Sequence, residues 1–255
     1  MRAVILAAGR GRRMGTYTDD RPKCLIPLDG TTLLDRHRDA LAAAGVDEIA
    51  IVTGYRADAL SGLLTRDFHA PRWAETNMVV SLTTAHEWLR TTACVVVYGD
   101  IFYTAETVRS LIAAPGELAI AYDPHWLALW SRRFADPLCD AEAFRLRSDA
   151  TVSEIGGRAA STQEIQGQYM GLLRFTPAVW TRVEQHLAAL APTARDQLDM
   201  TSLLGELIGS GEQILAVARQ GPWGELDQPS DLALYNAPSA AAAAAASGRR
   251  YEGLT

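Results

Sequence analysis

Short apolar runs and helically spaced apolar positions take turns along the first half of the chain. The apolar runs predict buried strands at residues 3–8, 48–53, 93–98 and 117–122, because uninterrupted apolar side chains suit a strand that is covered on both faces. Apolar positions three and four residues apart predict helices between them, at residues 31–44, 57–64, 79–89 and 105–113. Strands that alternate with helices form parallel sheets, so the pattern predicts an α/β fold.

The alternation breaks between residues 123 and 171, where only two short strands, at 143–147 and 151–155, are predicted. A strand at 169–175, helices at 177–190 and 200–209, and a strand at 214–218 then restore it. We therefore expect one domain over residues 1–238, with an insertion at about 123–171. Residues 239–255 include seven consecutive alanines, and we expect a tail without a catalytic role there.

The loop after the first strand carries the clearest chemistry of the chain. Gly9 and Gly11 allow main-chain N–H groups to approach an anion closely. Two common phosphate motifs are absent, because Met14 replaces the third glycine of a dinucleotide fingerprint and residues 15–17 do not read Gly-Lys-Ser/Thr. Basic side chains surround the glycines, which predicts a phosphate site; they are Arg10, Arg12, Arg13, Arg21 and Lys23.

The composition of the chain limits the classes of molecule that we expect it to bind. The 255 residues carry a formal net charge of −6, which argues against general nucleic-acid binding, where a basic surface is expected. The three cysteines are few and far apart, so no disulfide framework or zinc spacing is evident and a reducing cytoplasm is expected. The apolar run at 3–8 is too short for a signal core or a membrane span, so we expect no membrane association. The sequence does not decide the oligomeric state, and a homodimer is one possibility.

The first loop resembles the signature of nucleotidyltransferases that join a nucleoside triphosphate to a phosphorylated acceptor. The matching positions are Leu6 to Gly9, Gly11, Arg13, Met14, Pro22 and Lys23. The resemblance implies a Rossmann-like three-layer αβα fold with a mostly parallel mixed sheet, as in nucleotide-diphospho-sugar transferases. It also implies that Arg13 and Lys23 are catalytic and hold the triphosphate and the leaving pyrophosphate.

Two aspartates are expected to bind magnesium. Asp100 follows the apolar run at 93–98, and Asp227 lies in a Trp-x-Glu-x-Asp-x-Pro-x-Asp-Leu segment at 223–232 that resembles a late segment of the same family. Mg²⁺ is bound in proteins through one or two carboxylates together with phosphate oxygens. Asp231 is interpreted as part of a helix N-terminus, where negative charge is stabilised.

Several segments resemble the phosphocholine cytidylyltransferase-like branch, which includes enzymes that activate aminoethylphosphonate. They are residues 76–82, 98–103, 136–142, 154–156 and 164–172. This resemblance implies transfer of CMP from CTP to a small phosphate or phosphonate acceptor, with release of pyrophosphate. The expected nucleotide-binding residues are Leu6, Ala8, Gly9, Gly11, Arg12, Gly54, Asn77 and Ser81. For Asn77, a helix N-cap is the alternative role.

We expect the insertion to bind the acceptor. Trp126 and Trp130 supply aromatic faces, and Asp140 and Glu142 supply carboxylates, a combination that suits an ammonium group. Gln168 completes this expected set. Two alternatives stay open: the tryptophans are core residues, or an acidic or neutral acceptor uses Arg132 and Arg133 instead.

Other functions remain to be distinguished. One is a sugar-1-phosphate nucleotidylyltransferase that makes a nucleotide sugar, and another is a non-catalytic protein that only senses a nucleotide. The catalytic set of Arg13, Lys23, Asp100 and Asp227 argues against the sensor. A glycosyltransferase is disfavoured because the chain has no Asp-x-Asp motif. No general base is required, since a phosphate oxygen is already an anion at neutral pH.

Overall fold

A seven-stranded sheet forms the centre of the protein, which is described here from a computed structural model over residues 1–236. The alanine-rich segment expected as a tail lies outside the described residues. The strand order is β12-β8-β11-β6-β1-β4-β5. The strands are β1 (Arg2–Ala7), β4 (Glu48–Thr53), β5 (Arg66–His69), β6 (Cys94–Tyr98), β8 (Leu118–Asp123), β11 (Gln168–Phe175) and β12 (Ile214–Ala218).

Strand β1 lies between β4 and β6 and runs parallel to both. Its central residues Val4 and Ile5 are fully buried, which explains why this run has no polar positions. Strand β11 is antiparallel to its two neighbours, β6 and β8, while the other pairs in the sheet are parallel. This arrangement confirms the predicted mostly parallel mixed sheet.

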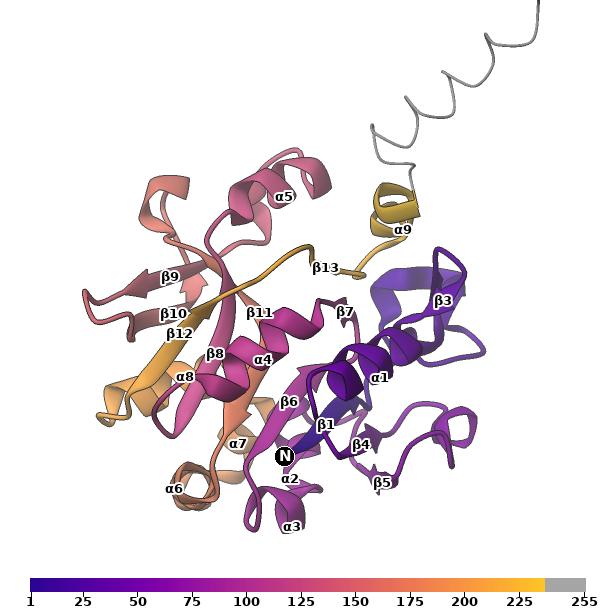
Figure 1. Cartoon of the computed structure of the whole chain (residues 1–255), viewed down its shortest axis with the longest axis horizontal. Coiled ribbons are helices and arrows are strands. Elements are labelled where there is room, and N and C mark those ends of the chain that lie inside the picture. The colour runs from indigo at the N-terminus through magenta and orange to yellow at the C-terminus, as the bar shows by residue number, and fades with distance from the viewer. Residues whose placement is uncertain (237–255) are drawn as a thin grey trace, which may run out of the picture.

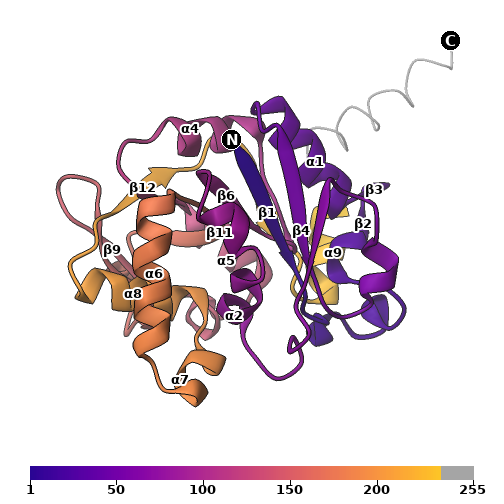
Figure 2. The ribbon, with the colours of Figure 1, turned by 90° about the horizontal axis from the view of Figure 1, so that it is seen from below.

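Helices cover both faces of the sheet, which gives the predicted three layers (Figures 1 and 2). Helices α1 (Leu33–Ala43) and α4 (Ala105–Ala113) lie on one face, and α2 (Met78–Thr83) and α6 (Pro177–Ala189) lie on the other. The remaining helices are α3 (His86–Leu89), α5 (Trp126–Arg133), α7 (Pro192–Gln197), α8 (Met200–Gly209) and α9 (Pro229–Asn236).

Two predicted helices differ from the structure. The helix expected at 57–64 is only a 3-10 turn, η3 (Ala57–Leu60), because the chain turns at Gly62 with φ +72° and then enters β5, which the sequence pattern did not predict. The helix expected at 79–89 is divided into α2 and α3. The hydroxyl groups of Thr83 and Thr84 donate to carbonyls three residues earlier at the break, and such bonds compete with regular helix bonding.

The segment between β8 and β11 carries α5 and a hairpin of β9 (Glu142–Leu146) with β10 (Val152–Arg158). Helix α8 packs on β10. Two further small sheets pair β2 (Pro27–Leu28) with β3 (Thr31–Thr32), and β7 (Ile101–Phe102) with β13 (Gly224–Glu225). Figure 1 shows α5, β13 and α9 together beyond the carboxyl ends of the parallel strands. Within residues 1–236, no helix has the length and apolar character needed to span a membrane.

Candidate active site

The glycine-rich loop leaves the carboxyl end of β1 and folds back over it. Gly11 has φ +66°, and a Cβ at this position would lie 2.7 Å from Cε of Lys23, so both the backbone conformation and the close contact require glycine. The 3-10 helix η1 (Arg12–Thr18) follows, and the Thr18 hydroxyl donates to the carbonyl oxygens of Gly11 and Gly15. The loop is therefore held in one conformation against Lys23.

Asp100 reaches the same place from β6. A Cβ on Gly99 would lie 2.7 Å from the carbonyl oxygen of Leu6, so the absence of a side chain lets the end of β6 pack directly on β1. Lys23 Nζ lies 2.9 Å from Asp100 Oδ2 and 2.9 Å from Asp227 Oδ1. Arg13 Nη1 lies 2.6 Å from the second oxygen of Asp227. The structure thus brings together both expected catalytic cations and both expected metal ligands.

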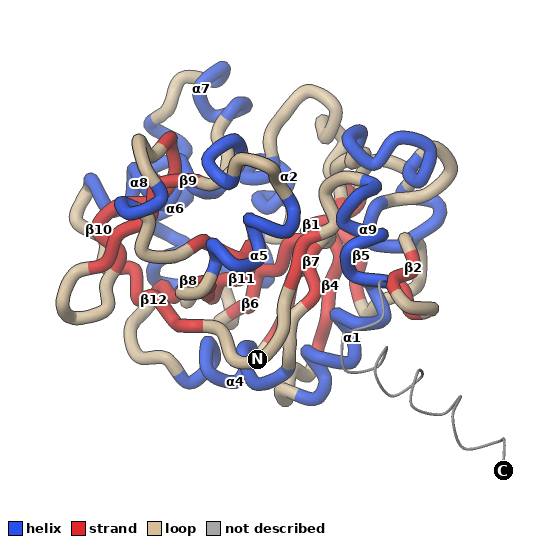
Figure 3. Tube along the Cα trace, turned by 90° about the horizontal axis from the view of Figure 1, so that it is seen from above, coloured by secondary structure: helices blue, strands red, loops and turns tan. Residues whose placement is uncertain are grey.

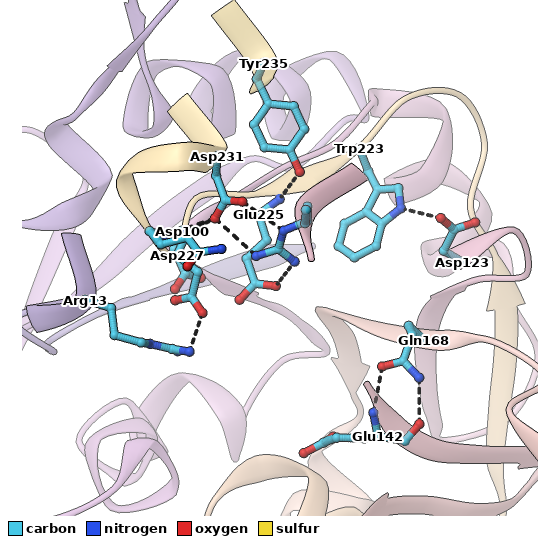
Figure 4. A network of polar contacts seen from close by, with 12 residues as sticks. Arg13, Asp100, Asp123, Glu142, Gln168, Trp223, Glu225, Asp227, Asp231 and Tyr235 are labelled. Atoms are coloured by element: carbon cyan, nitrogen blue, oxygen red, sulfur yellow. Dashed lines mark hydrogen bonds and ion pairs between the residues drawn. The ribbon is translucent and has the colours of Figure 1, made fainter. Parts of the chain in front are cut away.

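A third carboxylate, Glu225, belongs to this cluster. One ligand oxygen each of Asp100, Glu225 and Asp227 lies within 4.8 Å of the others, and Figure 4 shows the three side chains converging. Glu225 was not among the residues predicted from the sequence. It precedes Asp227 by two residues, and such positions lie on the same side of an extended chain, so this spacing could have identified Glu225 as a third carboxylate of the site.

The charges in this cluster shift one another's pKa. Burial, and then the charges of Asp100 and Asp227, raise the pKa of Glu225 to about 8. Burial alone would lower the pKa of Lys23, but Asp100 and Asp227 outweigh it, so the pKa of Lys23 is raised and its ammonium stays charged. The site therefore holds a permanent cation among three carboxylates, which suits binding of a polyphosphate together with a cation.

A cavity of about 220 Å³ lies beside the glycine-rich loop. Six of the eight expected nucleotide-binding residues line it: Leu6, Ala8, Gly9, Gly11, Asn77 and Ser81. Trp73 and Tyr98 add aromatic walls. Asn77 is also the N-cap of α2, where its side chain accepts a hydrogen bond from the Met78 N–H at 2.8 Å.

The other two expected nucleotide-binding residues do not line this cavity. Gly54 packs beneath Trp73, and a Cβ there would lie 2.6 Å from the indole ring, so Gly54 shapes the wall without reaching the space. The next residue, Tyr55, donates its N–H to the Ala8 carbonyl and fastens the two turns together. Arg12 is exposed at the outer side of the loop, beside Arg10 and Asp19.

A second cavity, of about 230 Å³, adjoins the first and shares Met78 and Tyr98 with it. Arg13, Glu225 and Asp227 line one side, and Figure 4 shows Glu142 and Gln168 on the opposite side. The acidic residues that line this cavity are Asp140, Glu142, Asp199, Glu225 and Asp227. Arg13 is its only basic lining residue among residues 1–236.

Two of these carboxyl groups are shifted by their surroundings. Burial raises the pKa of Asp140, and burial together with the charge of Asp199 raises the pKa of Glu142. Glu142 Oε1 accepts a hydrogen bond from the Thr201 hydroxyl at 3.3 Å. Asp199 is the N-cap of α8, and the sequence reasoning did not include it in the site. A cation in this cavity would stabilise the ionised forms of Asp140 and Glu142.

Four of the five expected acceptor residues line the second cavity: Trp130, Asp140, Glu142 and Gln168. The amide of Gln168 is engaged with the main chain of Glu142, at 3.1 and 2.6 Å, so it joins β11 to β9. Trp126 is buried away from the cavity, and its indole N–H donates to the Ile165 carbonyl at 3.2 Å. Trp126 and Trp130 are each 3% exposed and pack in the core, as the alternative expectation had it, and only Trp130 also lines the cavity.

Arg132 and Arg133, the pair expected to bind an acidic or neutral acceptor, have different surroundings in the structure. Arg133 is buried, and its guanidinium pairs with Asp231 and Glu225, whereas Arg132 is exposed. Asp231 lies in the first turn of α9, as expected, and accepts hydrogen bonds from the N–H groups of Asp227 and Gln228. Arg133 is therefore not available to an acceptor.

Comparison with known proteins gives the chain a family context. Residues 3–156 match the family model described as MobA-like NTP transferase domain. The chain is similar to a CTP:phosphoglutamine cytidylyltransferase of Campylobacter jejuni, with 35% identity over 251 residues that cover 91% of this chain and 98% of the relative. A 53-residue stretch, 21% of this chain and 22% of the relative, is 45% identical to a 2-aminoethylphosphonate cytidylyltransferase of Lancefieldella rimae.

Among solved structures, the inositol-1-phosphate CTP transferase of T. maritima has a similar fold. It superposes with a TM-score of 0.73 at 18% sequence identity, and the match covers 92% of this chain and 93% of that one. Figure 3 shows the central sheet between two sets of helices.

Proposed function

Because the chain belongs to the family of MobA-like NTP transferase domains and is a nucleotidyltransferase, we propose that it transfers CMP from CTP to a small phosphate or phosphonate acceptor that carries an ammonium group. The observation that supports this proposal is the position of the Lys23 and carboxylate cluster at the junction of two adjoining cavities. One cavity takes the nucleotide and the other takes the acceptor.

The reaction is an in-line displacement at the α-phosphorus of CTP. An acceptor oxygen forms the new bond to phosphorus, the bond to the bridging oxygen of the β-phosphate breaks, and pyrophosphate leaves. The acceptor oxygen is already an anion, so no side chain has to remove a proton. Lys23 and Arg13 bind and orient the triphosphate and stabilise the charge that develops on the leaving group.

The donor set of Asp100, Glu225 and Asp227 fits Mg²⁺, because all three supply the hard oxygen ligands that this ion prefers and two of the three are partly accessible. A bound Mg²⁺ would neutralise part of the triphosphate charge. The chain's own contribution is the spacing of the three carboxylates and the ammonium of Lys23 between two of them.

The composition of the second cavity supports an ammonium-bearing acceptor. Asp140, Glu142 and Asp199 lie in it beyond the metal-site cluster, and the one basic residue that lines it within the described part of the chain, Arg13, is paired with Asp227. Trp130 lines the cavity, but it is 3% exposed and its ring is already in contact with the guanidinium of Arg133, so the support for an ammonium group comes from the carboxylates. The relatives named for phosphoglutamine and 2-aminoethylphosphonate agree with a small phosphorylated or phosphonate acceptor and with CTP as the donor.

A pyrophosphate-release assay tests both choices. CTP, UTP, ATP and GTP are each paired with aminoethylphosphonate, phosphocholine, a hydroxyalkyl phosphonate and glucose 1-phosphate. We expect the highest kcat/KM with CTP and an amine-bearing acceptor. Equal turnover with UTP and a sugar phosphate would instead identify a sugar-1-phosphate nucleotidylyltransferase, and nucleotide binding without pyrophosphate release would identify a sensor.

Two acceptor-side variants then locate the ammonium site. Asp140→Asn and Glu142→Gln are expected to reduce the preference for amine over hydroxyl acceptors, because each removes a carboxylate from the cavity. Glu154→Gln is the matched control, since Glu154 is an exposed carboxylate on the hairpin of Glu142, pairs with Arg145 and does not line the cavity. If neither cavity variant changes the amine-to-hydroxyl ratio, the cationic acceptor is wrong.

A further inference from the structure

The guanidinium of Arg133, at the end of α5, is buried within an otherwise acidic region. Its side chain has 0% exposure. Nε and Nη2 donate to the two oxygens of Asp231 at 3.0 and 3.2 Å, and Nη1 donates to Glu225 Oε2 at 3.2 Å. The pairing with Asp231 has the two-pronged geometry that a guanidinium provides and an ammonium cannot. One side chain thus binds a carboxylate of the metal-site cluster and a second carboxylate behind it.

That second carboxylate fixes the main chain of another member of the cluster. Asp231 Oδ2, which accepts from Arg133, also accepts from the N–H of Asp227 at 2.8 Å and from that of Gln228 at 3.0 Å. Figure 4 shows Asp231 above Glu225 and Asp227. Arg133 therefore holds the side chain of Glu225 directly and the backbone of Asp227 through one intermediate residue.

Arg133 also contacts the wall of the acceptor cavity. Its guanidinium carbon lies 5.2 Å from the ring centre of Trp130, which lines that cavity, and 5.0 Å from the ring centre of Phe134. Trp130 in turn packs against Trp223, at 6.0 Å between ring centres. Trp223 precedes Glu225 by two residues. The acceptor wall and the segment that carries two carboxylates of the cluster are thus fastened to the same side chain.

We propose that Arg133 is a positioning residue of the nucleotidyl transfer, which holds Glu225 and Asp227 at the spacing that a divalent cation needs and joins them to the acceptor wall. This inference rests on the proposed function, because it assigns a task to the metal site proposed there. Stability alone does not account for such a group, since apolar replacements of buried ion pairs are often as stable as the pairs themselves. Groups that orient metal ligands typically affect metal affinity by about 10–100-fold.

The experiment measures binding of Mn²⁺, as a spectroscopic substitute for Mg²⁺, by electron paramagnetic resonance in the presence of CTP and without acceptor. The variants are Arg133→Gln, Arg133→Lys and Asp231→Asn. The control is Arg182→Gln, because Arg182 on α6 also bridges two carboxylates, Glu117 and Glu212, but far from the site. Circular dichroism establishes that each variant is folded, and the KM for the acceptor is measured in parallel.

We expect Arg133→Gln to weaken Mn²⁺ binding by about 10–100-fold and to raise the KM for the acceptor. Arg133→Lys should recover part of the loss, because the charge remains while the two-pronged geometry is lost. Asp231→Asn should also weaken Mn²⁺ binding. If Arg133→Gln does not fold, the Asp231→Asn result tests the positioning role in its place. Arg182→Gln should leave Mn²⁺ binding unchanged.

Two negative results have different meanings. If wild-type protein binds Mn²⁺ and the folded Arg133 and Asp231 variants bind it equally well, the positioning role is overturned and the proposed function stands. If wild-type protein binds Mn²⁺ no better than Asp227→Asn does, the metal site itself is overturned, and the role of Arg133 is overturned with it.

Discussion

Lys23→Met tests how the charges of the site are balanced, because methionine is an unbranched side chain of similar size that lacks the charge and the N–H donors of lysine. Lys23 is 11% exposed and lies 2.9 Å from each of two carboxylates, of which Asp227 is 6% and Asp100 is 26% exposed. Removing one partner of a buried ion pair costs about 3–5 kcal/mol. The lower value applies here, since Asp100 is partly hydrated and Asp227 keeps Arg13 as a partner.

A loss of about 3 kcal/mol corresponds to a melting temperature lower by about 6–12 °C for a domain of this size. Mg²⁺ should restore much of this loss, because it supplies positive charge to Asp100 and Asp227, the two carboxylates that lysine no longer neutralises. The assay is thermal unfolding of wild type and variant with and without saturating Mg²⁺. The expected result is a larger Mg²⁺-dependent rise in Tm for Lys23→Met than for wild type.

The same variant should lose activity even when Mg²⁺ has restored its fold. We expect kcat to fall by about 10²–10³-fold, the usual effect of deleting a donor that stabilises developing charge. The reasoning is refuted if Lys23→Met has the same Tm as wild type in the absence of Mg²⁺, or if its kcat equals that of wild type. An effect on the KM for CTP alone would mean that Lys23 contributes equally to ground-state and transition-state binding.

Three further predictions follow from the same geometry. Asp100→Asn and Asp227→Asn should each abolish metal-dependent turnover in a folded protein, since neutral amides cannot offset the charge of the cation; wild-type rates in either would remove that residue from the metal site. Gly99→Ala should destabilise the protein by about 1–3 kcal/mol in urea unfolding, because the new Cβ meets the Leu6 carbonyl at 2.7 Å; an unchanged midpoint would contradict this contact. His37 is buried against Tyr103 and near Asp100, and burial lowers its pKa from 6.5 to about 4. The unfolded chain therefore binds a proton more readily than the folded one, so this contribution to stability is complete above pH 6.5 and is lost as the pH falls to 4, by about 3 kcal/mol in total. His37→Leu should flatten the pH dependence of unfolding over that interval, and an identical pH profile would show that His37 does not set it.

Local sequence predicted most of the elements that form the sheet and its connections. Helices α4 and α8 and strand β12 begin and end where the pattern places them, and β4 coincides with the predicted strand at 48–53. Helices α4 and α8 each bury one apolar side and strands β4 and β12 are short apolar runs within the sheet, so the local pattern and the tertiary environment of these elements agree. The turn at Gly62 and the break between α2 and α3 were missed because one glycine and two threonine hydroxyls override a weak helical period.

The candidate site was predicted in part for a similar reason. Lys23, Asp100 and Asp227 lie in segments that end strands or turns at one edge of a parallel sheet, and such segments converge whatever the details of packing. Glu225 was not assigned, although it lies in the same segment as Asp227, because a carboxylate next to a turn has many possible partners. Asp199 was missed because it reaches the cavity as an N-cap of α8, an element remote in sequence from the insertion.

The sequence by itself determined the alternating α/β architecture and the glycine-rich loop, since both depend on spacing along the chain, whereas Asp100 and Asp227 were expected from the resemblance of their segments to nucleotidyltransferases. The tertiary structure alone decided which aromatic and charged residues of the insertion face the cavity. Trp126 and Trp130 lie one turn apart on one helix and are both buried, yet only Trp130 also lines the second cavity. Arg132 and Arg133 are neighbours, yet the first is exposed and the second is buried between two carboxylates. For the arginines the physical reason is that one helical residue turns the side chain by about 100°, so adjacent residues face different surroundings, and only long-range packing fixes which face is covered.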